Sequence, residues 1–559
     1  MTQEDYIDEA ITGVGYGRWQ FPFVSLTLLV HAVLPVHIVG SILLSVPMDF
    51  RCTPMNTSGE ILTHDRNQTI NAVTSNTLMM PVTEPIYDNK CGSPSHSSHD
   101  PPSLPRYVGP PSCLQVEYDT SVFPESIISE FNLICEWETL RPVFQMMYSL
   151  SAMVGSLLGG LLSDRCGRKR TMQLFSVVNL VGVVLMATSP WYTGVLLAKL
   201  LVGGSCSPML HVSFGLAQEV IPRRFRTLTG MLIGTSYSVS TVMFSGLGYL
   251  VRQWRHLLLT SSSFLLIIIP LTCIMQESPR WLVQRGRGEE AVNLLTTAAQ
   301  CNHAELSPSV TSAINKLKEI EPLVPAANDP GRREIQTLCE GLQGWWEYLK
   351  FPGLRTILLV TPLVWFLQGF VYLGLILNAN NFTSNNPYEY LALWGVMEAI
   401  AILLATPFNI ILGRRILCTL CLQLAGLLLI VDLLVPTGLQ WARWSLMMVA
   451  ILLASAAFQV NFMYAPELFP TVIRSRGCGL VSSAANIGFT LSPIITDLLA
   501  RQSWWVTSAA FGGAGILAGL LVPLLPETNN TPLPETIEDV EKRRKTMSKR
   551  KRRMRQEES

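Results

Sequence analysis

Aromatic and acidic side chains interrupt long apolar stretches of the sequence, where polar groups are costly and therefore informative. Trp365 and Tyr372 are seven residues apart, which places them on one face of a helix, and Phe366 lies beside them. Such a face of rings serves either for packing or for binding, because each ring attracts a desolvated organic cation by about 0.5–2 kcal/mol. Glu398 is the one carboxylate well inside such a stretch. An acid at that depth is usually functional or paired, so these residues indicate non-covalent binding of a small organic molecule.

The sequence lacks the residue groupings that catalysis, zinc binding or ATP hydrolysis requires. No Gly-x-x-x-x-Gly-Lys-Ser/Thr string is present to hold nucleotide phosphates, and no cysteine–histidine spacing suggests a metal. We also find no combination of nucleophile, base and orienting group. We therefore expect no enzyme, no cofactor and no metal. His31, His37 and His211 are the groups in apolar stretches that titrate near neutral pH, and each is either an interhelical hydrogen-bond partner or a proton carrier.

Composition identifies the class of protein. Only 14% of the 559 residues are charged and 49% are hydrophobic, whereas an ordinary soluble protein has about 25% charged residues. The mean hydropathy is +0.33. The net charge is +1, from 41 basic and 40 acidic residues, but ten of the basic residues lie at 542–555. The remainder is acidic, so nucleic-acid binding is not expected, and the basic tail is either solvated or attracted to anionic lipids.

The apolar stretches are long enough to cross a lipid bilayer as helices. A crossing needs about 20 mostly apolar residues, and a spanning backbone must satisfy its own hydrogen bonds. The sequence shows no barrel-type alternation, so helices are predicted. The twelve predicted spans are 20–46, 142–162, 171–189, 191–215, 227–250, 255–275, 354–377, 388–412, 416–436, 443–465, 477–499 and 503–525.

Basic residues in short loops predict how the spans are oriented, because such residues stay on the cytosolic side. The loops after spans two, four, eight and ten are the basic ones, so we expect them in the cytosol. Their basic residues are Arg165, Arg168, Lys169, Arg170, Arg223, Arg224, Arg226, Arg414, Arg415, Arg474 and Arg476. Both termini then lie in the cytosol as well.

The long loop at 47–141 has the features of an extracellular segment. Asn56 and Asn67 each begin an Asn-x-Ser/Thr string, which is a glycan acceptor pattern. An even number of cysteines in an oxidising compartment predicts two disulfides, with three pairings open. These cysteines are Cys52, Cys91, Cys113 and Cys135.

A second long loop, 276–353, divides the spans into two sets of six. It reads as short amphipathic helices at 289–299 and 310–320, on the cytosolic side. The division predicts two pseudo-repeated bundles with a substrate site between them. The predicted organisation is a cytosolic N-terminus at 1–18, a first bundle at 19–275 that includes the extracellular loop, the linker at 276–353, a second bundle at 354–525 and a tail at 526–559.

Several sequence strings resemble those of known transporters. Residues 155–169 read Gly-Ser-Leu-Leu-Gly-Gly-Leu-Leu-Ser-Asp-Arg-Cys-Gly-Arg-Lys, which resembles the loop motif of the major facilitator superfamily. Glu-Ser-Pro-Arg-Trp-Leu at 277–282, Tyr-Ala-Pro-Glu-Leu-Phe-Pro at 464–470 and Tyr-Asp-Thr-Ser-Val-Phe-Pro at 118–124 are similar to strings of solute carrier family 22. That family comprises organic cation, organic anion and carnitine transporters, and the resemblance covers roughly residues 13–541.

The resemblance implies a conformational role for charged residues at cytosolic helix ends. Asp164 with its neighbouring arginines is expected to form a charge-paired latch between helices. The repeat of this motif at 410–415 keeps Gly-Arg-Arg but lacks the acid, so a second latch is expected to be weaker or built differently. The expected gating residues, which hold the cytosolic side shut while the cavity faces outward, are Asp164, Arg165, Arg168, Glu219, Arg226, Glu277, Arg280, Glu467 and Arg474.

The resemblance also implies which residues line the substrate cavity. These are Trp365, Phe366, Tyr372, Glu398, Gln459, Asn486, Ser149, Ser207 and Phe214. Related carriers often have an aspartate or an arginine where this sequence has the neutral Asn486. No other Lys or Arg lies at mid-depth, and Lys199 is expected near the cytosolic half of span four. The field in the cavity should therefore be close to neutral, with Glu398 making it slightly negative.

These observations predict an all-α polytopic transporter of the plasma membrane. We expect it to carry small organic solutes by alternating access, most readily organic cations, zwitterions or polar neutral metabolites. An organic anion carrier of the same family and a transporter-like receptor or scaffold without flux stay open as alternatives. The expected partners are the solute, a coupling ion or exchanged counter-substrate, and the lipid bilayer, with anionic inner-leaflet lipids at the tail.

Overall fold

The computed structural model describes most of the chain outside its long loops and its two ends. The described residues are 3–48, 50–53, 115–120, 123–318, 348–378, 387–436, 438–470, 473–499, 505–529, 534 and 537–543. The predicted glycan acceptors Asn56 and Asn67, together with Cys91 and Cys113, lie outside these residues, as does most of the basic tail.

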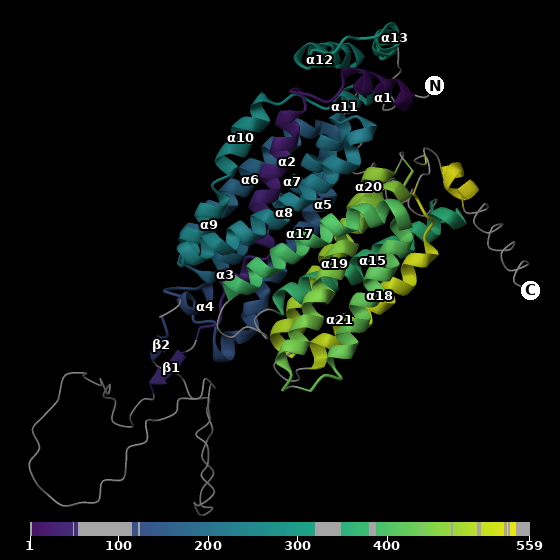
Figure 1. The fold of residues 1–559 in the computed structure, drawn as a ribbon. Helices are drawn as coiled ribbons and strands as arrows, with labels where there is room; N and C mark the ends of the chain where they lie inside the picture. The colour runs from purple at the N-terminus through teal and green to yellow at the C-terminus, as the bar shows by residue number, and fades with distance from the viewer. Residues whose placement is uncertain are drawn as a thin grey trace, which may run out of the picture.

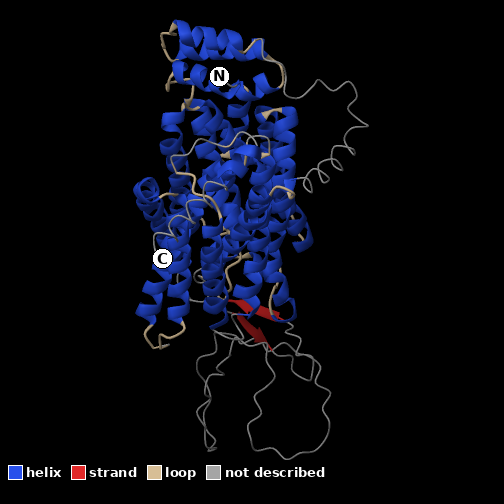
Figure 2. Cartoon of the chain, turned by 90° about the vertical axis from the view of Figure 1, so that its right-hand side faces the viewer, coloured by secondary structure: helices blue, strands red, loops and turns tan. Residues whose placement is uncertain are grey.

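The molecule is a bundle of long helices with one small sheet at an end (Figures 1 and 2). The helices of the first half are α2 (Phe21–Ile38), α3 (Ser41–Leu44), α4 (Ile127–Glu130), α5 (Arg141–Cys166), α6 (Arg168–Thr188), α7 (Tyr192–Val220), α8 (Arg223–Leu250), α9 (Trp254–Ser262) and α10 (Leu265–Ile274). Those of the second half are α15 (Pro352–Leu377), α17 (Pro387–Leu412), α18 (Arg414–Asp432), α19 (Gln440–Leu468), α20 (Arg474–Pro493) and α21 (Trp505–Leu521).

Eleven helical stretches of the described chain are long and apolar enough to cross a membrane. They correspond to eleven of the twelve predicted spans, and α8 corresponds to the twelfth, predicted at 227–250. This helix has 28 residues but is rich in Ser, Thr and Gly. Its polar side chains are tolerated because they face other helices: Ser240 and Ser245 are buried, whereas Leu232 and Met243 on the other face are exposed.

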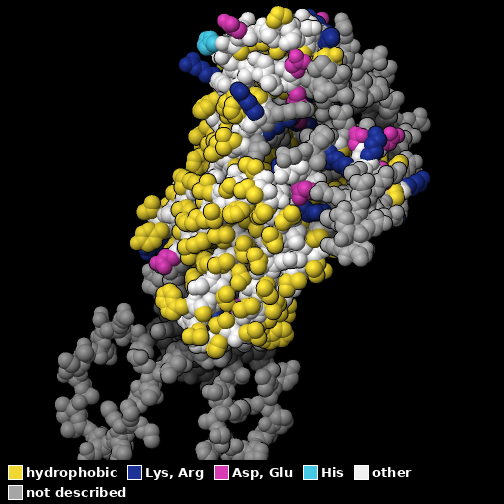
Figure 3. Space-filling view, turned by 45° about the vertical axis from the view of Figure 1, so that its right-hand side comes forward, with side chains coloured by type: hydrophobic (Ala, Val, Ile, Leu, Met, Phe, Trp, Pro, Cys, Tyr) yellow, Lys and Arg dark blue, Asp and Glu magenta, His cyan; other side chains and the backbone are white. Residues whose placement is uncertain are grey.

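The two halves meet along two pairs of long helices. Helix α5 packs against α20, and α8 packs against α17. Apolar side chains cover the outer surface of the bundle, while charged ones gather mainly at one end (Figure 3). Leu185 in α6 and Leu403 in α17 are examples of such exposed apolar residues. In water such a surface would be unfavourable, so it belongs in lipid.

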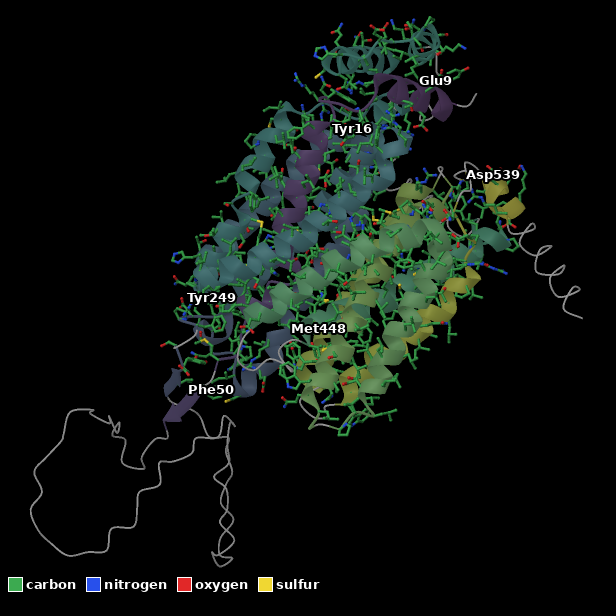
Figure 4. The ribbon with its side chains drawn as sticks, viewed as in Figure 1. Glu9, Tyr16, Phe50, Tyr249, Met448 and Asp539 are labelled. Carbon is green, nitrogen blue, oxygen red and sulfur yellow. The ribbon has the colours of Figure 1, made fainter. Side chains whose placement is uncertain are left out.

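The end that carries the charged groups is named the linker end here. It holds α1 (Gln3–Val14), α11 (Pro279–Gln284), α12 (Gly288–Cys301) and α13 (Pro308–Lys316), with α1 packed on α12 and α13. Helices α12 and α13 confirm the two amphipathic helices predicted in the linker. Figure 4 places Glu9 and Tyr16, and also Asp539 of the C-terminal segment, towards this end. The described parts of both termini therefore lie on the same side of the bundle.

The opposite end, named the sheet end, carries an addition to the predicted all-α fold. Strands β1 (Phe50–Thr53) and β2 (Gln115–Tyr118) pair antiparallel, with Cys52 opposite Val116. Cys135 forms a disulfide, as predicted for that residue. The described end of the loop predicted to be extracellular is held to the first half by Glu130, which accepts from Trp254 Nε1 at 2.7 Å and pairs with Arg255.

The first predicted span, 20–46, is broken into α2 and α3. Pro35 lies inside α2 and has no N–H, so the carbonyl of His31 one turn earlier lacks its helical donor. Ser240 of α8 donates to that carbonyl instead, at 3.1 Å. The helix ends at Ile38, just before Gly40. Helix α8 thus supplies the hydrogen bond that Pro35 removes inside α2, and the break itself lies beyond the proline, at Val39 and Gly40.

The same cap begins one helix in each half. Gly167, with φ 98°, precedes α6, and Glu277 accepts from the backbone N–H of Arg168 at 2.9 Å. Gly413, with φ 84°, precedes α18, and Glu527 accepts from the backbone N–H of Arg414 at 3.0 Å. Carboxylates are stabilising at helix N-termini. This repetition supports the predicted division into two pseudo-repeats.

The caps predict that alanine at Gly167 or Gly413 destabilises the fold. A Cβ at Gly167 would lie 2.3 Å from Glu277 Oε2, and one at Gly413 would lie 2.9 Å from the Glu527 carboxyl. Together with the positive φ, each substitution should lower the free energy of unfolding by about 1–3 kcal/mol. Thermal unfolding of the detergent-purified protein measures this. Gly160→Ala is the control, because a Cβ there meets nothing within 4 Å; equal loss in all three variants would contradict the argument.

Candidate functional site

Aromatic rings from three helices form one connected cluster in the second half. We name it the ring cluster: Trp365 and Tyr372 of α15, Trp394 of α17, and Phe458 and Phe462 of α19. Tyr372 stacks on Phe458 with ring centroids 4.7 Å apart, and Trp365 lies 5.7 Å from the same ring. Phe489 of α20 adds a stacked contact to Phe458. The structure thus brings together two of the predicted rings, and Phe458 joins them.

Glu398 lies at the edge of the ring cluster and is buried. Tyr372 Oη donates to Glu398 Oε1 at 2.5 Å, and Trp394 lies one helical turn before Glu398 on α17. Glu398 Oε2 is also buried, and the carboxyl group interacts with Ser238 of α8 across the boundary between the halves. One carboxyl oxygen is thus fixed by a phenol, and the carboxyl group as a whole lies where the two halves meet.

Side chains of the first half complete the surroundings of the ring cluster. Tyr237 of α8 meets Trp394 edge to face with centroids 6.3 Å apart, and Phe214 of α7 meets Phe462 at 5.0 Å. Gln459 packs against α8, where a Cβ on Gly234 would lie 2.6 Å from its Nε2. The predicted residues Phe214 and Gln459 therefore lie where the two halves meet.

Four predicted lining residues lie differently. Ser149 is fully buried and donates to the Gln145 carbonyl of its own helix. Phe366 packs against an apolar cluster within the second half, away from the ring cluster.

Asn486 donates to the Ser482 carbonyl one turn earlier in its own helix, at 2.9 Å. Ser207 contributes its carbonyl, which accepts from His211. The local backbone thus satisfies these polar groups, as is common for Ser and Asn in helices.

Lys199 is a correction to the sequence analysis. It lies two turns from the start of α7, which begins at the sheet end, and not near the linker end. The side chain is fully buried. Its ammonium group donates to the His37 carbonyl at 3.3 Å and lies 4.3 Å from the centre of the Phe144 ring. Within the described part of the chain, no carboxylate pairs with it.

A charge cluster at the linker end ties α5, α6 and α7 together. Arg168 pairs with Asp164 at 2.7 Å and with Glu219 at 3.1 Å. Glu277 caps the start of α6 by accepting from the backbone N–H of Arg168. The expected latch of Asp164 and Arg168 is therefore formed within the first half, whereas Arg165 is exposed.

The second half carries the equivalent cluster with one substitution. Arg414 pairs with Glu467 at 3.3 Å. Ile410 occupies the place that Asp164 has in the first half, and Asn529 supplies the missing acceptor: its Oδ1 accepts from Arg414 at 2.7 Å. Its Nδ2 also donates to the Ile410 carbonyl at 3.2 Å. The second latch is thus built differently, as expected, with an amide in place of a carboxylate.

Asp8 of α1 is a partner that sequence reasoning missed. It accepts from Arg226 at 2.9 Å and also pairs with Arg280. Two of the expected gating residues are therefore held by the N-terminal helix. The remaining expected gating residue, Arg474, donates to the Phe469 carbonyl of its own half.

The ion pairs of these clusters each stay within one half of the molecule. The halves meet through rings and hydroxyl groups. At the sheet end, Phe123 stacks on Tyr388 with centroids 5.3 Å apart, and Ser245 of α8 donates to the Tyr388 carbonyl at 2.6 Å. Deeper in the bundle, Ser156 of α5 bonds to Ser483 of α20 at 3.0 Å. The linker-end charge clusters therefore brace each half, whereas rings and hydroxyl groups join the halves, together with the opposite charges of Arg141 in α5 and Asp497 in the second half.

Comparison with known proteins identifies the family. Residues 128–539 match the family described as sugar (and other) transporter. Solute carrier family 22 member 6-A of Xenopus laevis is 32% identical over 435 residues, covering 78% of this chain and 75% of that protein. The chain belongs to solute carrier family 22. Solute carrier family 22 member 20 of Mus musculus is 31% identical over 76% of this chain and 74% of its own.

More distant comparisons agree with this assignment. The organic cation transporter protein of Drosophila melanogaster is 28% identical over 96% of this chain and 94% of its own. The major facilitator superfamily proton:xylose symporter XylE, bound to 6-bromo-6-deoxy-D-glucose, aligns with a TM-score of 0.57 at 15% identity, covering 95% of this chain and 98% of that one. This likeness shows the major facilitator fold. This solute carrier family 22 member is a multi-pass membrane transporter and not an enzyme.

Sequence reasoning missed several residues of the site. Phe458 and Phe462 are four apart on α19, and Trp394 is four residues before Glu398. Helical spacing around the chosen residues Gln459 and Glu398 would have found them. Asp8 and Asn529 had no such signal, because their partners are more than a hundred residues away in the sequence.

The rebuilt second latch predicts a specific effect of substitutions at Asn529. Asn529→Ala removes the acceptor of Arg414 and should lower the free energy of unfolding by about 1 kcal/mol. Asn529→Asp keeps that acceptor and should stay closer to wild type. Thermal unfolding of the purified transporter measures both. Asp539→Ala is the control from the same tail, because its pair with Lys542 is largely exposed and should contribute little. An Asn529→Ala variant as stable as this control would contradict the assignment.

Proposed function

We propose that this transporter carries small organic cations, zwitterions or polar neutral molecules across the plasma membrane by alternating access. The observation that carries the proposal is Glu398, a buried carboxylate beside the ring cluster with which no described basic residue pairs. Aromatic faces and a single carboxylate are the groups that stabilise an organic cation away from water.

The side chains around Glu398 have separate roles in the proposed binding. Tyr372 holds Oε1 by its hydroxyl, which fixes the direction of the carboxyl group. Trp394 and Phe458 flank Tyr372 with centroids 5.7 and 4.7 Å away. Their faces replace the hydration shell of a cation, while Oε2 supplies the opposite charge. The anionic group of a zwitterion, or the polar group of a neutral molecule, would then face Gln459 and Tyr237 of the opposite wall.

The charges near the ring cluster favour cations over anions. Asn486 is neutral and bonded within its own helix. Lys199 is enclosed by Phe144 and Tyr148 towards the sheet end. An organic anion would meet Glu398 without a described basic residue in the ring cluster to offset it.

Alternating access in this protein would move two braced halves against each other. The clusters around Arg168 and Arg414 keep the helices of each half together during the movement. The contact of Phe123 with Tyr388 closes the sheet end in this conformation. Opening towards that end would separate these rings, and new contacts would then form between the linker-end clusters of the two halves.

The proposed orientation places the linker end in the cytosol and the sheet end outside. The basic residues of the short loops support it through the positive-inside rule, and α1 and Asp539 lie towards the same end (Figure 4). In this orientation the tail at 542–555 meets the inner leaflet, where its basic residues would attract anionic lipids. A coupling ion or a counter-substrate completes the cycle.

Uptake by cells expressing the protein tests the charge preference. The probes are trimethyl(phenethyl)ammonium and phenylpropanoate, which share a phenyl ring and carry opposite charges. We expect saturable accumulation of the cation, and Glu398→Gln should reduce its kcat/KM by about tenfold or more, because a buried charge partner is lost.

Glu389→Gln is the matched control for Glu398, since Glu389 lies on the same helix α17 but is exposed near its start. Surface biotinylation confirms equal amounts of each variant at the membrane. Preferential uptake of phenylpropanoate would favour an anion carrier. Ligand binding by the purified protein without flux would favour a receptor.

A further inference from the structure

The hydrogen bonds of His211 define which ring nitrogen carries the proton. His211 Nδ1 lies 2.7 Å from the carbonyl oxygen of Ser207 on the same helix. A carbonyl can only accept, so Nδ1 is the donor, and Nε2 of the neutral ring carries a lone pair. The hydroxyl of Ser482 lies 2.7 Å from Nε2. Ser482 is therefore the donor in this second bond.

The bond between His211 and Ser482 joins the two halves. His211 belongs to α7 of the first half and Ser482 to α20 of the second. The imidazole also stacks on Phe462 of the ring cluster, with centroids 6.2 Å apart. His211 is half-buried, in contrast to the fully buried His37. It therefore stands at the edge of the proposed binding site, with its acceptor directed across the boundary between the halves.

Ser482 can give up this bond at little cost, whereas His211 cannot. A serine in a helix can return its hydroxyl proton to the carbonyl four residues earlier. The neighbouring Ser483 makes such a bond to Gly479 at 2.9 Å. His211 Nε2 has no other donor among the described residues, so its lone pair stays available to any N–H or O–H group that replaces the serine.

We propose that His211 is a substrate-contact residue whose Nε2 accepts a hydrogen bond from an N–H or O–H group of the transported molecule, which displaces Ser482. This inference rests on the proposed function and narrows its substrate class to molecules that combine a positive or neutral head with a donor, such as protonated amines. A quaternary ammonium ion has a similar charge but no donor, so it would not make this contact.

The exchange links binding to movement of the halves. Two side-chain hydrogen bonds join α5 and α7 to α20 at this depth: His211 with Ser482, and Ser156 with Ser483. A donor-bearing substrate would replace the first of these with a bond to one half only. Binding would thereby weaken the contact between α7 and α20, whereas a substrate without a donor would leave it in place.

Two cations that share the phenethyl group test the proposal on the full-length transporter. Phenethylammonium carries N–H donors, and trimethyl(phenethyl)ammonium does not. His211→Phe keeps a ring against Phe462 but removes the acceptor. We expect it to raise the KM for phenethylammonium by about three- to tenfold, the range of one neutral hydrogen bond, and to change the KM for the trimethyl compound less than twofold.

Ser482→Ala provides a second variant with the opposite expectation. It removes the competing donor, so the KM for phenethylammonium should fall about threefold relative to the KM for the trimethyl compound. Ser492→Ala is the matched control, because Ser492 lies on the same helix and donates at 2.8 Å to Phe370 within its own half. The ratio between the two KM values should stay at the wild-type value in this control.

The outcomes separate this inference from the proposed function. If His211→Phe shifts both KM values equally, or if Ser482→Ala leaves their ratio unchanged, the substrate contact at His211 is wrong while cation transport stands. Uptake of only the trimethyl compound by the wild type would also overturn it. If the wild type carries neither cation, the cation transport in the proposed function is wrong, and the inference fails with it.

Discussion

Hydrocarbon offers no hydrogen bonds, so every polar atom inside a span must find its partner within the protein. This constraint explains where the polar residues of the structure lie. The hydroxyls of α8 face neighbouring helices, and Ser240 repairs the carbonyl that Pro35 leaves without a donor. Several buried polar atoms still lack a described hydrogen-bond partner, among them both ring nitrogens of His37 and the Ser41 hydroxyl. Glu398 and the Ser482 contact of His211 differ from these because they lie beside the ring cluster, where we propose that a ligand binds.

The two halves build the same helix cap and arginine cluster at the linker end with partly different residues. In each, a glycine with positive φ lets a distant glutamate cap the next helix, and an arginine beside the cap pairs with a glutamate at the end of another helix. Ile410 breaks the sequence repeat, yet Asn529 restores an acceptor for Arg414 from a distant part of the chain. The geometry of the motif is therefore retained where its sequence is not, because the guanidinium group needs an oxygen and not a particular residue.

Local signals predicted most of the fold, and long-range partners could not be read from sequence. Span length and hydropathy indicated the helices, and loop motifs indicated the family, since both are properties of contiguous residues. Trp365, Tyr372 and Glu398 were found because their helical spacing or depth is visible in the chain. The break after Ile38 and the side-chain direction of Phe366 depend on neighbouring parts of the fold, whereas the depth of Lys199 could have been read from its place near the start of the predicted span 191–215. The pairing of Asp8 with Arg226 and Arg280 joins segments far apart, and no periodicity encodes it.

The distribution of charged and neutral contacts suits a molecule whose two halves must move against each other while each half stays folded. Charge-assisted hydrogen bonds contribute about 1.5–3 kcal/mol each, whereas neutral ones contribute about 0.5–1.5 kcal/mol. The charged pairs of the linker-end clusters lie inside the halves, and hydroxyl groups and rings join the halves to each other. Helices within a half are thus held more firmly than the halves hold each other. A substrate that offers one neutral hydrogen bond, as at His211, supplies about as much free energy as one hydrogen bond between the halves. Binding can therefore drive their movement by replacing such a bond.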